Sequence, residues 1–278
     1  MREERAVRPA AVAGTWYPGR SDLLRVAVDG YLAGVQPTTL DGRLLALVSP
    51  HAGLTYSGSV AAHGYALLRD RKDLTAILVG PSHYHHFDGV ALYPEGTFET
   101  PLGPVPVEAT IGAALLDSDA VVKSLPRPHL EEHSLEMQLP FLKRLVGDLR
   151  IVPLLMGRQS RETVDALAGA LARVLAGRPA LLVASSDLSH YRPAPVAHRL
   201  DALVVSDVER FDPEALMDRL ETSPEHACGG GPIVSVLKAA RALGARHATA
   251  LRYADSGDQG ERDKSRVVGY LSAALTAP

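Results

Sequence analysis

The sequence predicts an α/β fold with a central, mostly buried β-sheet flanked by helices on both faces. Three observations predict it: short, continuous apolar runs recur along the chain, a polar or glycine-rich turn follows each run, and helix-like patterns separate the runs. Continuous apolar runs indicate strands buried on both faces. No repeat, low-complexity tract or linker divides the 278 residues, so we expect one domain over 1–278.

The expected strands are six apolar runs. They are LLALVSP ending at Pro50, TAILVGPS ending at Ser82, LRIVPLLMG ending at Gly157, LLVASSD ending at Asp187, TALRYADS around Tyr253 and RVVGYLSAAL around Tyr270. A further segment, 90–106, reads as a hairpin with Glu95-Gly96 at its turn.

Four helices are expected between the strands. Segment 59–69 begins at Ser59, a residue type that caps helix starts. In segment 134–146, Pro140 should kink or end the helix. The patterns over 161–175 and 232–243 are more regular, and the second has Pro232 in its first turn.

The composition describes an ordinary globular chain, with 46% hydrophobic and 22% charged residues. The net charge is −3 without a basic run, so we expect neither nucleic acid nor an anionic membrane as a partner. A single cysteine favours a reducing compartment. The sequence shows neither a secretory signal nor an apolar stretch long enough for a membrane span. We therefore expect a cytoplasmic protein.

Three expected strands end in histidine or aspartate. His51 follows the first, His83 the second, and Asp187 with His190 the fourth. In open α/β sheets, ligands bind in the crevice at the carboxyl ends of the strands. One histidine after one strand is usually structural, but this coincidence at three strand ends predicts a functional site.

Two other clusters are candidates. HLEEHSLEMQLP contains Glu132 and His133, which either reach the same crevice or stabilise a helix start through the macrodipole. Cys228 precedes Gly229, Gly230 and Gly231 at a helix start, which should leave amides free and favour the thiolate. The alternative for Cys228 is a small buried apolar residue. A phosphate loop is less favoured because the Walker lysine and hydroxyl are missing.

Imidazole nitrogens and a thiolate together suit iron, copper or zinc. We expect His51, His83 and Cys228 to bind the metal, because three protein ligands leave positions open for water, oxygen or substrate. Asp187 and His190 would be the catalytic acid/base pair, with the carboxylate orienting the imidazole.

Several motifs occur together in a recognisable order. SPHAG, VGPSH, EEHSLEMQLP, IVPLLMG, SSDLSHY, CGGGPI and YADSGD, spread over nearly the whole chain, resemble the Memo family, which includes protein B of the AmmeMemoRadiSam system. The resemblance implies a fold like that of class III extradiol dioxygenases, which hold iron with two histidines and a glutamate. By this resemblance His51 and His83 are the histidine ligands and His190 the acid/base, while Cys228 replaces the glutamate.

The resemblance also implies an activity and partners. The expected activity is an iron(II)- or copper-dependent oxidoreductase, with zinc as another candidate metal and a small molecule or peptide as substrate. AMMECR-type and radical-SAM proteins are the implied partners. In one alternative, the protein is a non-catalytic binding module that recognises a peptide or an anionic ligand through the amides of Gly229 to Gly231 and nearby histidines. Two others are a zinc hydrolase and a cysteine nucleophile, Cys228 with His226 or His190 as base. Glu132, His133, Gly229 and Gly230 would support the ligands or contact substrate.

Overall fold

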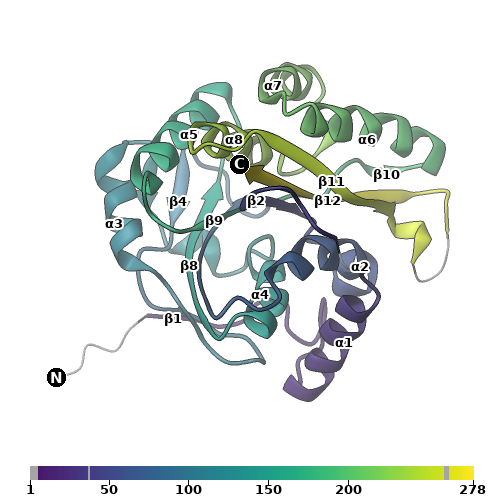
Figure 1. The fold of residues 1–278 in the computed structure, drawn as a ribbon, viewed down its shortest axis with the longest axis horizontal. Coiled ribbons are helices and arrows are strands. Elements are labelled where there is room, and N and C mark those ends of the chain that lie inside the picture. Colours follow the sequence, from purple (N-terminus) through teal and green to yellow (C-terminus); the bar gives the residue numbers. More distant parts are fainter. Residues whose placement is uncertain (1–5, 37, 260–262) are drawn as a thin grey trace.

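The computed structural model describes residues 6–36, 38–259 and 263–278 of the chain. In these residues, nine strands form one large sheet with the order β10-β12-β2-β9-β3-β8-β4-β7, and β11 pairs with β12 outside this path. A small sheet has the order β1-β5-β6. Helices lie on both sides of the large sheet (Figure 1), so the expected α/β architecture is confirmed.

The strands are β1 Val7–Arg8, β2 Arg43–Ser49, β3 Asp73–Pro81, β4 Val90–Leu92, β5 Thr97–Phe98, β6 Val105–Pro106, β7 Val122–Ser124, β8 Asp148–Met156, β9 Leu181–Ser185, β10 His190–Arg192, β11 His247–Asp255 and β12 Val267–Ala277. The helices are α1 Ser21–Ala33, α2 Leu54–Tyr65, α3 Ala109–Ser118, α4 Leu139–Leu145, α5 Arg161–Leu175, α6 Ala194–Glu209, α7 Pro213–Thr222 and α8 Gly230–Ala242. Short 3₁₀ turns are η1 Ala66–Leu68, η2 Arg127–His129, η3 Glu136–Gln138, η4 Pro224–His226 and η5 Ser256–Asp258.

The centre of the large sheet is parallel. Strands β2, β9, β3 and β8 run in the same direction, with Ala46 opposite Leu182 and Ile77 opposite both Leu182 and Val152. Antiparallel strands close the sheet on both sides, β12 against β2 and β4 against β8. The carboxyl ends of β2, β3 and β9 therefore meet at one edge of the sheet, as the positions of the histidines in the sequence require.

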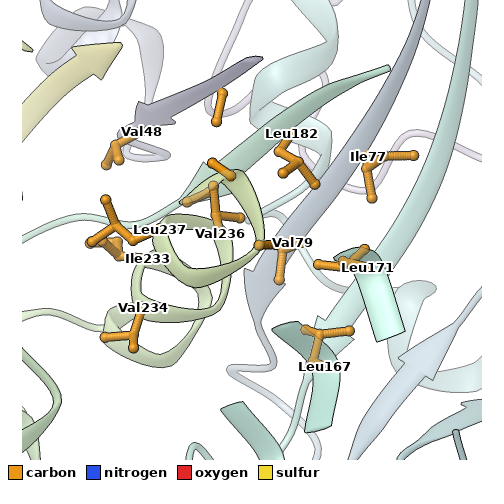
Figure 2. Packing of buried hydrophobic residues seen from close by; sticks show 14 of the residues in the cluster. Val48, Ile77, Val79, Leu167, Leu171, Leu182, Ile233, Val234, Val236 and Leu237 are labelled. Atoms are coloured by element: carbon orange, nitrogen blue, oxygen red, sulfur yellow. The ribbon is translucent and has the colours of Figure 1, made fainter. Parts of the chain in front are cut away.

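One face of the parallel strands packs against α5 and α8. Val48, Val79 and Leu182 belong to the same buried cluster as Leu171 of α5 and Ile233 of α8 (Figure 2). Each of these side chains is almost completely buried. Burying one aliphatic side chain of this size contributes about 1.5–3 kcal/mol, so this face anchors the strands that carry the site.

The opposite face packs against α1, α2 and α4. Leu47 and Leu78, each adjacent in the sequence to a residue of the first face, join Leu24, Tyr65 and Phe141 in a second cluster. The rings of Tyr65 and Phe141 stack with centroids 5.3 Å apart. Consecutive strand residues thus point into two different apolar layers, which explains why these strands read as uninterrupted apolar runs.

The N-terminal segment is attached to the body by a buried arginine. Arg8 in β1 forms an ion pair with Glu136 and donates to the carbonyls of Glu132 at 2.6 Å and His129 at 2.9 Å. Tyr17 donates to the same Glu136 carboxylate at 2.6 Å. Because a buried charge is tolerated only when it is paired and hydrogen-bonded, these contacts fix segment 129–136 against the N-terminus.

The expected helix over 59–69 starts earlier than its Ser59 suggested. Helix α2 begins at Leu54 after Gly53, Ser59 lies inside it, and η1 continues it to Leu68. Small residues allow this helix to pack closely: a Cβ on Gly58 would lie 2.7 Å from the ring of Tyr31. At the helix start itself the Leu54 amide donates to the Trp16 carbonyl at 2.9 Å, a partner distant in the sequence, and the prediction of a serine cap was wrong.

The expected hairpin over 90–106 was also wrong in its pairing. Strand β4 joins the large sheet between β8 and β7, and the hairpin is formed by β5 and β6, with Thr97 opposite Pro106. Gly96 is not at its turn; it has φ +111°, and a Cβ there would lie 2.0 Å from the carbonyl oxygen of Ala6. The glycine is required by close approach to the N-terminal segment.

The helices expected over 161–175 and 232–243 agree with the structure in position, whereas the one expected over 134–146 is present as η3 followed by the shorter α4. Helix α5 spans the expected residues and is capped by Ser160, whose hydroxyl accepts from the Thr163 amide; α8 begins at Gly230, just before Pro232. Pro140 neither kinks nor ends a helix, because α4 starts at Leu139 and places this proline in the first turn, where its missing N–H has no partner to lose. In the described part of the chain, every helix is too short or too polar to cross a bilayer.

Candidate metal centre

His51 lies at the carboxyl end of β2 and is held on both sides. Its backbone amide donates to Asp187 Oδ1 at 2.8 Å, and its ring Nδ1 is 2.9 Å from Ser185 Oγ. The side chain is almost fully buried. Burial, followed by the nearby His83, lowers the pKa of His51 to about 3. The imidazole is therefore neutral at pH 7, which is the form that binds metal.

The hydrogen bonds around Ser185 determine which nitrogen of His51 is free. The Ser185 hydroxyl has one proton, which it donates to the carbonyl of Ser134 at 2.6 Å, and it accepts from Gln138 Nε2 at 2.7 Å. His51 Nδ1 must therefore donate to Ser185 Oγ. The lone pair of His51 lies on Nε2, which is 3.2 Å from Cys228 Sγ.

His83 follows β3 and is held by one carboxylate. Glu132 accepts from the His83 amide at 2.6 Å through Oε2 and contacts His83 Nδ1 at 2.9 Å through Oε1. Burial alone would raise the pKa of Glu132, but the hydrogen bonds from His83 lower it to about 2. An ionised carboxylate only accepts, so His83 donates from Nδ1 and its Nε2 is left free, as in histidines that bind metals.

Cys228 supplies the third donor from the start of α8. One donor atom from each of His51, His83 and Cys228 lies within 4.8 Å of the other two. Around one tetrahedral metal such atoms would be about 3.5 Å apart, given metal–nitrogen and metal–sulfur distances of about 2.1 and 2.3 Å. The three residues therefore fit one metal ion with small side-chain adjustments.

The Cys228 thiol differs from expectation in its acidity. Burial, with a further contribution from Asp187, raises the pKa of the thiol well above its usual value. The helix start alone therefore does not generate a thiolate. A bound cation would, because metals bind the deprotonated sulfur.

The three glycines after Cys228 do not offer free amides. The Gly229 amide donates to Ser186 Oγ at 2.9 Å and the Gly231 amide to Gln159 Oε1 at 2.7 Å, while the Gly230 amide meets the carbonyl of Ala227 at 3.3 Å. All three glycines are buried. The expectation that they present amides to a ligand was therefore wrong.

Close packing explains the glycines instead. A Cβ on Gly229 would lie 2.4 Å from the Ser185 carbonyl oxygen, and one on Gly230 would lie 2.6 Å from Leu220. The glycine run lets the start of α8 approach the end of β9 closely enough to place Cys228 beside His51.

Asp187 and His190 follow β9 but do not form the expected pair. Among the contacts of the described residues, Asp187 Oδ1 accepts from the amides of His51 and Ala52, and its carbonyl accepts from the Cys228 amide at 3.2 Å. His190 Nδ1 instead lies 2.7 Å from the carbonyl of Leu188. Asp187 thus positions two metal-ligand candidates, and Leu188 orients His190.

His133 belongs to the same cluster. Its ring stacks on that of His83 with centroids 4.6 Å apart and lies 4.2 Å from the ring of Trp16. Burial and the nearby His51 lower the pKa of His133 to about 4. With His83 and Glu132 it forms a second group of potential ligands, but Glu132 already accepts from His83, so we place both residues in support of the first group.

A cavity of about 700 Å³ opens in front of these residues. His51, His83, His133, Asp187 and His190 all line it. Its volume is in the range of small-molecule sites. The structure therefore places four histidines and an aspartate of the sequence prediction in one cavity wall, at the sheet edge where α/β folds bind ligands.

Comparison with known proteins identifies the family of the chain. The family model described as "Memo-like protein" matches residues 8–274. The chain belongs to the Memo family. Curated MEMO1 family proteins from Methanosarcina mazei and Aeropyrum pernix are each 38% identical to it, over 96% and 95% of this chain and 98% of each relative. One from Thermotoga petrophila is 35% identical over 96% of this chain and 99% of its own length.

A solved structure shares the fold. The uncharacterized protein JW3007 from Escherichia coli K12 superposes with a TM-score of 0.53 over 82% of this chain and 99% of its own. Its sequence is 15% identical, so this likeness concerns the fold alone. The family resemblance and the α/β architecture expected from the sequence are both confirmed.

Two residues that hold the candidate ligands of this Memo-family chain in place, Ser185 and Gln138, were not identified from the sequence. Ser185 lies in the strand and Gln138 in EEHSLEMQLP, and both are completely buried. The signal for Gln138 was present, since a buried polar side chain within an apolar segment must have a partner. The partner of Ser185, His51, comes from a different strand, which the sequence alone does not reveal.

Proposed function

We propose that this Memo-family protein is a metal-dependent oxidoreductase in which His51, His83 and Cys228 hold one iron or copper ion beside the substrate cavity. The observation that supports it best is the convergence of three donor atoms from three separate segments of the chain at one point. When bound, iron or copper supplies redox chemistry and open positions for oxygen or substrate. A thiolate among the ligands is soft, which favours copper(I) or iron over magnesium and calcium.

The protein contributes prearranged ligands. Ser185 and Glu132 fix the two imidazoles with their Nε2 lone pairs free, and Asp187 holds the backbone of His51 and Cys228. Such partners raise the basicity of the ligands and fix their orientation. Metal binding then needs little reordering of side chains, which lowers its entropic cost.

His190 is the proposed acid/base. The Leu188 carbonyl can only accept, so the neutral His190 ring donates from Nδ1 and keeps its lone pair on Nε2. His190 lines the same cavity as the metal ligands. Its Nε2 can therefore take a proton from a bound substrate and return it later.

A nucleophilic role for Cys228 has less support. Neither expected base pairs with the thiol among the described contacts: His226 Nδ1 lies 3.2 Å from the carbonyl of Leu200, His190 Nδ1 lies 2.7 Å from that of Leu188, and Cys228 Sγ contacts His51. His51 in turn donates to Ser185. Cys228 Sγ therefore contacts His51 Nε2, whose lone pair is also the one that would bind the metal.

Metal analysis of protein purified without oxygen tests this proposal. We expect one equivalent of iron or copper in the unaltered chain and its loss in His51→Ala, His83→Ala and Cys228→Ser. His86→Ala is the matched control, because this exposed histidine lies in the same loop as His83 and outside the ligand group. Stoichiometric zinc would favour the hydrolase alternative, and metal retained in all three ligand variants would show that the site is elsewhere.

We also infer a cellular setting. A single cysteine without a disulfide partner favours a reducing compartment, which supports a cytoplasmic location. The family resemblance implies AMMECR-type and radical-SAM proteins as partners in modifying a small molecule or peptide. Co-purification of the tagged chain with such proteins tests this, and their consistent absence would contradict it.

A further inference from the structure

The cavity beside the metal centre has a second, aromatic wall. The sequence contains one tryptophan and nine tyrosines, and the tryptophan with three of the tyrosines lines this single cavity: Trp16, Tyr56, Tyr191 and Tyr270. Tyr56 is 50% exposed and Tyr191 is 63% exposed. Exposed aromatic rings gathered at a cavity mouth mark a recognition surface, because their apolar faces remain uncovered without a ligand.

Arg266 is a permanent cation close to these rings. Arg266 lines the cavity, and its Cζ lies 5.5 Å from the centre of the Tyr191 ring. Among the residues that the structure describes, Arg266 has no carboxylate partner, whereas the neighbouring Lys264 pairs with Asp255 and Asp258. A guanidinium over an aromatic face keeps its N–H groups pointing outward at its edge, where they can bind a planar anion with two bonds.

Tyr191 is held in an unusual conformation. Its φ is +57°, a region that side-chain-bearing residues seldom occupy and that costs about 1–3 kcal/mol. The residue follows His190 directly, and the two rings lie 5.6 Å apart at a steep angle. This backbone turn places the ring that contacts Arg266 beside the proposed acid/base.

The Asp187 carboxylate directs its Oδ1 atom toward backbone amides. Asp187 Oδ1 accepts from two backbone amides, those of His51 and Ala52. Apart from the tyrosines and Arg266, the other polar residues of the described lining are His51, His83, His133, His190, Thr15, Thr55 and Ser256. Among the described lining residues Arg266 is therefore the one permanent cation, and Asp187 is the one carboxylate.

We propose that the cavity takes a small, planar aromatic carboxylate, whose carboxylate binds Arg266 and whose ring lies between the tyrosines and the metal ligands. This assignment rests on the proposed function for the reactive end of the ligand, but the Arg266 end stands independently of it. The cavity of about 700 Å³ accommodates one or two rings. Arg266 is then the residue that selects charged over neutral ligands.

Trp16 provides a direct measurement, because it is the single tryptophan and lines the cavity. We would titrate cinnamate, neutral cinnamamide and ring-free acetate against the chain, following Trp16 fluorescence with calorimetry as a second readout. Cinnamate should bind at least about tenfold more tightly than either comparison ligand, since charge-assisted hydrogen bonds contribute about a factor of 10–100.

Variants then assign the effect to its residue. Arg266→Gln should weaken cinnamate binding about 10- to 100-fold and leave cinnamamide binding unchanged. Arg199→Gln removes the same charge from an exposed position on α6 and should change neither. Equal binding of cinnamate to wild type and Arg266→Gln, or of cinnamamide and cinnamate to wild type, would overturn the proposal, as would Arg266-dependent binding of phenyl phosphate without cinnamate.

The same titration on chelator-treated and on metal-loaded protein separates this proposal from the metal assignment. Arg266-dependent selectivity in both forms supports the anion site whatever the metal analysis gives. Selectivity that is present only with metal and survives Arg266→Gln would show that the carboxylate binds the metal, which would refute the role of Arg266 and leave the metal centre standing.

Discussion

Replacing Ser185 with alanine should weaken metal binding without disrupting the sheet. The Ser185 hydroxyl joins His51 Nδ1 at 2.9 Å, Gln138 Nε2 at 2.7 Å and the Ser134 carbonyl at 2.6 Å. Its removal leaves a buried imidazole donor without an acceptor, which costs about 1–3 kcal/mol. Loss of a residue that orients a metal-bound histidine lowers affinity about 10- to 100-fold. The two figures agree, because a factor of ten is about 1.4 kcal/mol.

The assay is a competition between the protein and a chelator of known affinity, together with urea unfolding of the metal-free chain. Ser49→Ala is the matched control. Ser49 lies opposite Ser185 in the neighbouring strand and is also buried, but its hydroxyl contacts the Pro50 carbonyl at 3.5 Å and the Tyr65 side chain, neither of which belongs to the candidate ligand group. The Ser49→Ala variant should therefore bind metal nearly as tightly as the unaltered chain. Nitrogen NMR of the metal-free protein should show His51 protonated on Nδ1 in wild type and a mixture of tautomers in Ser185→Ala.

Two outcomes would refute this reasoning. If Ser185→Ala bound metal as tightly as Ser49→Ala, the hydroxyl would not prearrange the ligand. If His51 in wild type carried its proton on Nε2, the lone pair would point at Ser185 and away from Cys228, and the assigned direction of the hydrogen bond would be wrong.

Two further predictions concern stability. Burial lowers the pKa of His129 to about 3, against 6.5 for the free group, so the unfolded state alone gains a proton below pH 6.5. The free energy of unfolding of the metal-free protein should therefore fall by about 2 kcal/mol between pH 7 and pH 5 because of His129. In His129→Asn the free energy of unfolding should fall less over that range. Equal losses for the two proteins in urea titrations would contradict this. Gly229→Ala should destabilise the chain and weaken metal binding, because its Cβ would meet the Ser185 carbonyl at 2.4 Å. Gly30→Ala in α1, with open space at its Cβ, should stabilise by about 0.5–1 kcal/mol; the reverse order of melting temperatures would refute the packing account.

The strands were the most predictable part of the fold, because a strand that is buried on both faces requires an uninterrupted apolar run in the sequence. The short and peripheral elements were not. Strand β4 has three residues and pairs with two strands far from it along the chain, so its partner cannot be derived from local pattern. Helices α1, α3, α6 and α7 were not predicted, although their buried residues recur at helical spacing, as Leu24, Val28 and Leu32 do in α1.

The candidate site was predictable in its residue types and less so in its connections. Histidines after β2 and β3 mark the sheet edge because strand direction alone places them there. That Asp187 would bind the His51 amide and leave His190 to Leu188 depends on backbone geometry beyond the strand end. The glycine run after Cys228 predicted an unusual local structure correctly, but the need was close packing against Ser185 and Leu220.

The buried contact between Arg8 and Glu136 also bears on the order in which the molecule is made. On the ribosome Arg8 is synthesised early, and its acceptors in segment 129–136 follow more than a hundred residues later. The same segment carries Glu132, which orients His83, and Cys228 is synthesised later still. The nascent chain thus holds two histidines well before it has the cysteine. With the proposed ligand set, metal taken up during translation would meet only two of the three ligands, so the proposal implies that loading follows completion of the chain.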